Sequence, residues 1–142
     1  MLGRLAAGGA AFVGRGGEVD QESREAAMCH VLIIEDNLIA ALDIREVLRE
    51  AGATSFAYAG SEDEAVAAAK VDPPDLITAD VSLAGGSGPE AVRRIEARLG
   101  SRPVIFITGA PDRRLVRERH LVIGKPFATN RLSAAFRSIA PV

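Results

Sequence analysis

The feature that most constrains this fold is a regular alternation of short apolar runs with longer amphipathic segments, which begins near Met28. Continuous apolar runs of this length are typical of strands that are buried on both faces of a parallel sheet. We expect strands at 31–34, 76–79, 104–107 and 121–123, with a weaker strand at 55–59. Because strand and helix alternate throughout, the chain is predicted to form a parallel sheet with helices on both faces.

The helical segments carry start signals and differ in length. Asn37 is placed to cap the first helix, and Ser61 with Glu64 three residues later predicts a capping box for the second. A last helix is expected over 129–139, whereas the stretch 109–120 leaves room for at most one or two helical turns. The sequence therefore predicts a shortened fourth helix.

Composition excludes several classes of protein. The 142 residues, 48% hydrophobic and 25% charged with a net charge of −2, fit one domain with a core of its own. The chain lacks a basic block interleaved with aromatic residues, so we expect no nucleic-acid partner. It also lacks an apolar run near the roughly 18 residues of a membrane span. The single Cys29 excludes an intramolecular disulfide, in keeping with a cytoplasmic location.

Residues 1–28 differ from the rest of the chain because they are rich in glycine and poor in large apolar side chains. Such a segment cannot offset the entropy that ordering costs. We expect it to be disordered, or to result from a translation start placed upstream of Met28. A signal peptide is the alternative for its apolar stretch 5–13. Residues 29–142 are then predicted to form the domain.

Five polar side chains stand directly after predicted strands. In an open parallel sheet, ligands bind beyond the carboxyl ends of the strands, near the point where the strand order reverses. Taken singly, each residue has an ordinary structural explanation, such as a helix N-cap or a turn. Together, three carboxylates with one hydroxyl and one ammonium at a single edge indicate a site. The five residues are Glu35, Asp36, Asp80, Thr108 and Lys125.

The chemistry of this set favours a divalent cation and a phosphoryl group. Clustered carboxylates repel one another, and a hard cation held by oxygen ligands relieves that repulsion. Mg²⁺ is favoured, with Mn²⁺ as the alternative, because it keeps waters or phosphate oxygens among its ligands. An Asp80 carboxylate could attack phosphorus, while the cation and Lys125 neutralise charge on the phosphoryl oxygens. The Thr108 hydroxyl could donate to one of those oxygens and signal that phosphate is present.

Four features follow one another along the chain: the segment 31–37, Asp80, Thr108 and the segment 125–127. In their order and spacing, they resemble the signature of response-regulator receiver domains over about residues 29–140. The resemblance implies a flavodoxin-like (CheY-like) doubly wound sheet of five parallel strands with the order 2-1-3-4-5. It implies a cis Lys125–Pro126 bond, and phosphorylation of Asp80 supported by Lys125 and Thr108. It also implies metal binding by Glu35, Asp36, Asp80 and the backbone carbonyl of Ser82.

Two segments, 80–88 and 103–108, are similar to those of the atypical single-domain receivers of alphaproteobacteria, including the FAT GUY group. This resemblance implies a sensor histidine kinase, for example of the HWE type, or a histidine phosphotransfer protein as partner. About 17 residues follow Lys125, and the last helix needs them. The phosphorylated form is therefore expected to act through another, unidentified protein.

Two positions depart from the receiver pattern. Typical receivers carry an aromatic residue three positions before the lysine, and here that residue is Val122. The atypical branch carries an aromatic residue two positions after its threonine, and here that residue is Ala110. We therefore expect an altered route from the site to the output face.

Two other interpretations compete with a phosphorylated receiver. A haloacid-dehalogenase-like phosphatase also uses an aspartate nucleophile with Mg²⁺, but that chemistry needs Asp-x-Asp, and Ser82 occupies the third position. A receiver fold that has lost phosphorylation could act only as a protein-binding module. The sequence favours a receiver whose only catalysis is its own phosphorylation and dephosphorylation at Asp80, not an enzyme with a separate substrate.

Overall fold

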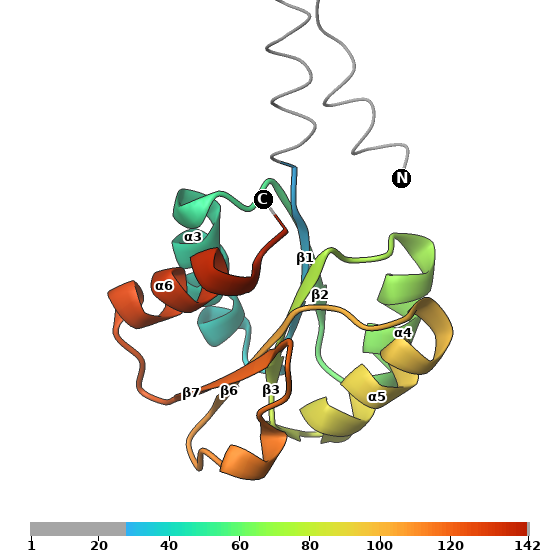
Figure 1. The fold of residues 1–142 in the computed structure, drawn as a ribbon. Helices are drawn as coiled ribbons and strands as arrows, with labels where there is room; N and C mark the ends of the chain where they lie inside the picture. The colour runs from blue at the N-terminus through green and yellow to red at the C-terminus, as the bar shows by residue number, and fades with distance from the viewer. Residues whose placement is uncertain (1–27, 142) are drawn as a thin grey trace, which may run out of the picture.

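Five parallel strands form the central sheet of the computed structural model, which describes residues 28–141 (Figure 1). They are β1 (His30–Ile34), β2 (Ser55–Ala59), β3 (Leu76–Asp80), β6 (Val104–Thr108) and β7 (His120–Gly124). Their spatial order is β2-β1-β3-β6-β7, which is the predicted order 2-1-3-4-5. Because every neighbouring pair is parallel, all five carboxyl ends lie at one edge of the sheet.

A small antiparallel hairpin separates β3 from the next helix, where the sequence predicted only a glycine-containing loop. It consists of β4 (Ser82–Leu83) and β5 (Gly86–Ser87), with Ser82 opposite Ser87 and Leu83 opposite Gly86. The hairpin begins two residues after Asp80, so it lies at the same edge as the predicted site.

Helices cover both faces of the sheet. Figure 1 shows α3 (Leu38–Ala51) and α6 (Thr129–Ile139) on one face, with α4 (Glu62–Val71) and α5 (Gly88–Leu99) on the other. Side chains alternate across a strand, so Ile33 of β1 enters the core under α3 and α6, while Leu32 enters the core under α4 and α5. Every residue of β1 is buried, which accounts for the continuous apolar run over 31–34.

The helix caps confirm one prediction and correct another. The Asn37 side chain accepts a hydrogen bond from the Ala40 N–H at 3.0 Å and caps α3 as predicted. Ser61 caps α4 by accepting from the Glu64 N–H at 3.2 Å, but the Glu64 carboxylate accepts from the Gly60 N–H at 2.8 Å. The predicted capping box is therefore displaced by one residue, because Glu64 reaches past the N-cap to the loop before it.

One turn of 3₁₀ helix, η1 (Arg113–Leu115), stands between β6 and β7 in place of a full fourth helix. Its length confirms the predicted shortening. The neighbouring sheet surface is nevertheless covered, since Phe106 of β6 is only 2% exposed. The His120 ring packs edge-on against Phe106 with the ring centroids 5.8 Å apart, so a side chain from β7 covers part of this surface.

The predictions for residues 1–28 concern a segment that, apart from Met28, lies outside the described residues, as does Val142. Among the helices formed within 28–141, none is long and apolar enough to cross a membrane.

Candidate functional site

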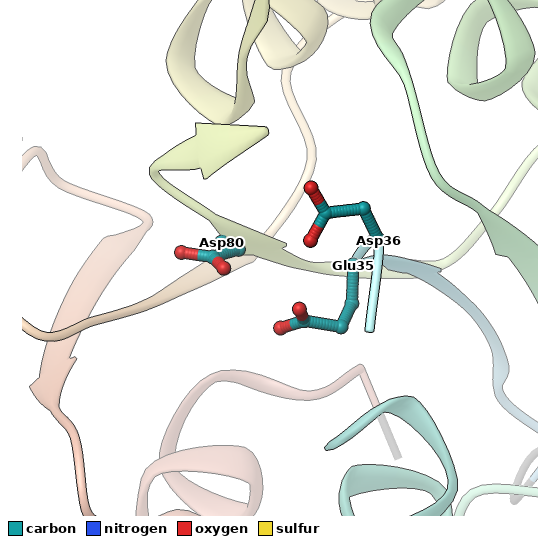
Figure 2. Close-up of side chains that lie close together, drawn as sticks. All are labelled: Glu35, Asp36 and Asp80. Atoms are coloured by element: carbon teal, nitrogen blue, oxygen red, sulfur yellow. The ribbon is translucent and has the colours of Figure 1, made fainter. Parts of the chain in front are cut away.

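Three carboxylates gather at the carboxyl edge of the sheet, where β1 and β3 lie side by side (Figure 2). Glu35 and Asp36 directly follow β1, and Asp80 is the last residue of β3. Each offers an oxygen that lies within 4.8 Å of those of the other two. The adjacency of the two strands thus brings together the three acidic residues that the sequence singled out.

The side chain of Lys125 also reaches this cluster. Lys125 directly follows β7, which is separated from β3 by β6. Its Nζ lies 3.1 Å from Asp80 Oδ2 and 3.3 Å from Glu35 Oε1. The Lys125 N–H donates to the Thr108 carbonyl at 2.8 Å, and the Lys125–Pro126 bond is cis, as the receiver resemblance implies. The ammonium therefore joins the carboxylates of two neighbouring strands.

Burial and neighbouring charges perturb both Glu35 and Lys125. Burial raises the pKa of Glu35, and the Asp80 carboxylate adds to this, while the Asn37 N–H and Lys125 oppose it. Partial burial works against the charged form of Lys125, but the hydrogen bond to Asp80 and the charge of Glu35 outweigh it and raise its pKa. Lys125 is therefore an ammonium at neutral pH, and ionisation of Glu35 is less favourable than that of an ordinary glutamate.

The donor set fits a hard divalent cation. Three carboxylates face one ammonium, which leaves an excess of negative charge at the site. Oxygen ligands of this kind suit Mg²⁺, which completes its coordination with water or phosphate oxygens. Glu35, Asp36 and Asp80 are the residues that would hold the ion.

Asp36 makes a contact that the sequence did not predict. Its Oδ2 accepts a hydrogen bond from the Ala84 N–H, at the tip of the β4–β5 hairpin, at 2.7 Å. At the start of the hairpin, the Ser82 N–H lies 3.4 Å from Asp80 Oδ1. Ser82 thus stands beside the acceptor, and the role of its carbonyl as a metal ligand stays a prediction. The glycines at 85, 86 and 88 were the only sequence signal for this local structure.

Thr108 ends β6, the strand adjacent to β3, and is 5% exposed. Its hydroxyl accepts a hydrogen bond from the Ala110 N–H at 3.2 Å. Val122, which occupies the usual aromatic position, lies opposite Phe106 and packs into the core under α4 and α5. The structure therefore places Thr108 at the predicted edge, with its oxygen bonded to the loop that follows it.

Glu35 gives a pH prediction for the metal-free protein. A carboxyl whose pKa is raised by folding favours the folded state most below its ordinary pKa, and this contribution is lost as the pH rises through the raised value. We therefore expect Glu35→Gln to be more stable than the wild type at neutral pH, and this advantage to vanish in acid. Thermal unfolding in EDTA between pH 4 and 8 measures the difference, and a gap that is independent of pH would contradict it.

The doubly wound sheet and the acidic edge with its lysine are those of a receiver, and the family model for the response regulator receiver domain matches residues 31–137. The chain therefore belongs to the response-regulator receiver domains, the class that the sequence predicted, and its sheet order confirms the predicted fold.

Individual relatives include alphaproteobacterial regulators. The chain is 38% identical over 124 residues to the phyllosphere-induced regulator PhyR of Methylorubrum extorquens, covering 82% of this chain and 46% of that protein. It is 35% identical over 86 residues to the transcriptional regulatory protein PdtaR of Mycobacterium tuberculosis, covering 61% of this chain and 42% of that protein. The chain thus spans less than half the length of these two curated relatives.

Solved structures agree with this assignment. The receiver domain of PhyR from Erythrobacter litoralis superposes with a TM-score of 0.71 at 30% identity, over 79% of this chain and 89% of that domain. PhyR from Brucella abortus superposes with a TM-score of 0.67 at 26% identity, over 96% of this chain and 64% of that protein. The likeness to PhyR therefore extends from sequence to fold.

Proposed function

We propose that this receiver accepts a phosphoryl group on Asp80, with Mg²⁺ held by Glu35, Asp36, Asp80 and the Ser82 carbonyl. Receiver domains are signalling modules of two-component systems rather than enzymes with separate substrates. The donor would be a sensor histidine kinase, for example of the HWE type, or a histidine phosphotransfer protein in the cytoplasm. The phosphorylated form would act on a further protein.

The observation that supports this proposal most strongly is the double contact of Lys125 with Asp80 and Glu35, at 3.1 and 3.3 Å, beside three converging carboxylates. A structural ion pair would need one carboxylate for one ammonium. A surplus of two carboxylates at the edge where open α/β sheets bind ligands calls for a cation and an anionic substrate. Mn²⁺ would substitute for Mg²⁺ at such an all-oxygen site.

The chain's own residues supply the rest of the reaction. An Asp80 carboxylate oxygen attacks the phosphorus of a phosphohistidine; the new O–P bond replaces the N–P bond, and the released imidazole takes up a proton. The Lys125 ammonium, already beside Asp80, pairs with the negative phosphoryl oxygens. Glu35, Asp36 and Asp80 would hold the cation, which would supply further neutralisation of charge on the same oxygens. Thr108 would exchange its contact with Ala110 for a hydrogen bond that its hydroxyl donates to the phosphoryl group.

Incubation with acetyl phosphate tests the proposal on the wild-type protein. We expect intact-mass spectrometry to show one phosphoryl adduct per chain with Mg²⁺, a weaker signal with Mn²⁺, and none in EDTA. The reason is that three carboxylates repel an anionic donor until a cation is bound. A protein that binds Mg²⁺ but gains no adduct would favour the alternative, a receiver fold that acts only as a binding module.

A further inference from the structure

The β4–β5 hairpin connects the acidic cluster with helix α4. Its tip donates the Ala84 N–H to Asp36 Oδ2 at 2.7 Å, and its first residue, Ser82, stands beside Asp80. Ser82 faces Ser87 across the hairpin. The position of this hairpin therefore sets how the backbone at 82–84 meets the two aspartates.

The first residue of α4 anchors the other side of the hairpin. Glu62 Oε2 accepts a hydrogen bond from the Ser87 N–H at 2.8 Å, and the Glu62 N–H lies 3.5 Å from the Gly85 carbonyl. The Glu62 side chain is 19% exposed, and its Oε1 lies 3.4 Å from Arg94 of α5. Two helices on the same face of the sheet thus hold the carboxylate against the hairpin.

Gly86 leaves the space that this carboxylate occupies. A Cβ at that position would lie 2.0 Å from Glu62 Oε2, and the backbone has φ of +116°, a conformation that favours glycine. A side chain at position 86 would therefore displace Glu62 from Ser87.

The two anchors of the hairpin differ in one respect. Asp36 holds the tip, but its carboxylate is also a candidate metal ligand, so this anchor is part of the proposed metal site. Glu62 does not belong to the acidic cluster, and its contact with Ser87 involves none of the candidate metal ligands. Glu62 therefore holds the hairpin from outside the proposed metal site.

We infer that Glu62 is a positioning residue: by holding Ser87 it keeps Ser82 and Ala84 in place against Asp80 and Asp36 for metal binding. This inference rests on the proposed function, because it concerns the same metal-dependent site. Neither charge nor contact with the ion is required of Glu62. What is required is an acceptor oxygen at the Ser87 N–H.

Two substitutions separate the acceptor from the charge. Glu62→Ala removes both, whereas Glu62→Gln removes the charge and keeps a carbonyl oxygen that can accept from Ser87. The affinity for Mg²⁺ is measured by NMR titration of the full chain. We expect the affinity of Glu62→Ala to be about tenfold lower than that of the wild type, because a charge-assisted hydrogen bond is lost. The affinity of Glu62→Gln should stay within about twofold of the wild type.

Two further variants make the result specific. Asp63→Asn removes a charge from the same turn of α4. Because Asp63 Oδ1 lies 3.0 Å from Arg94 Nη1, this variant also removes an ion-pair partner of Arg94. It should nevertheless bind Mg²⁺ like the wild type. Gly86→Ala keeps the Glu62 carboxylate but displaces it, and should bind as weakly as Glu62→Ala. Amide exchange of Ser87 in the metal-free protein should be at least about tenfold faster in both Glu62→Ala and Gly86→Ala than in the wild type.

Equal weakening in Glu62→Ala and Glu62→Gln would overturn the inference, because it would show a long-range effect of charge. Unchanged Mg²⁺ affinity in Glu62→Ala would overturn it as well. If the wild type itself does not respond to Mg²⁺, the proposed function fails and Glu62 has no metal site to position. The Ser87 exchange rates in the metal-free variants would then still decide whether Glu62 anchors the hairpin.

Discussion

Asp80→Asn is expected to gain no phosphoryl adduct from acetyl phosphate and Mg²⁺ under conditions in which every wild-type chain can gain one. The attacking group must be an anionic oxygen, and the neutral amide oxygen of asparagine is far less nucleophilic than a carboxylate. The substitution also takes one negative charge from the cluster that would hold the cation. Both effects act in the same direction, so the loss should be complete in intact-mass spectra.

The fold of Asp80→Asn should survive, because asparagine has the shape of aspartate and its amide oxygen can still accept from Lys125. One consequence can be checked by NMR: the pKa of Glu35 should fall, since the Asp80 charge is among the causes that raise it. Asp43→Asn, at an exposed position on α3, is the matched control and should be phosphorylated normally. An adduct of wild-type size in Asp80→Asn would place the acceptor on another side chain, which peptide mapping would identify.

Gly88→Ala is expected to have the largest effect on the folded state. A Cβ at Gly88 would lie 2.0 Å from the Asp80 carbonyl oxygen and 2.9 Å from its carbon, so backbone must move. Overpacking of this kind costs about 1–3 kcal/mol when side chains can shift, and we expect a cost at or above the top of this range against a rigid strand. The start of α5 and the acceptor would be displaced together, and phosphorylation should fall at least about tenfold.

Gly109→Ala is the control for Gly88→Ala, because a Cβ at Gly109 meets nothing within 4 Å. Urea denaturation of the two variants beside the wild type measures the difference in the free energy of unfolding. A Gly88→Ala protein as stable as Gly109→Ala would contradict the close approach of α5 to β3. A stable Gly88→Ala protein that is still phosphorylated at the wild-type rate would show that the acceptor tolerates this displacement.

The strands and the candidate site could be predicted because each follows from a local pattern. A sheet covered on both faces buries both sides of its central strands, so residues 31–34 of β1 and 104–107 of β6 appear as continuous apolar runs. Parallel strands end at a common edge, so polar residues after several strands converge without any knowledge of the loops. For this reason the sequence could predict that the side chains of Glu35, Asp80 and Lys125 lie close together.

The hairpin and its anchors could not be predicted, because they depend on contacts between residues that are far apart in sequence. Asp36 and Ala84 are 48 positions apart, and Glu62 and Ser87 are 25 apart. Two-residue strands carry no periodic pattern, and an acidic residue in the first turn of a helix is expected from the helix dipole alone. The sequence therefore carries no signal that separates Glu62 from an ordinary residue at a helix start.

The sequence by itself determined the order of strands and helices, the acidic edge with its lysine, and the shortness of the segment before β7. Those properties depend on hydrophobic period and on the common direction of parallel strands. Only the tertiary structure decided that Asp36 bonds to the Ala84 N–H, that Glu62 occupies the space left by Gly86, and that His120 covers Phe106. Those contacts arise when separate segments pack against one another, and packing leaves no mark in the local pattern of either segment.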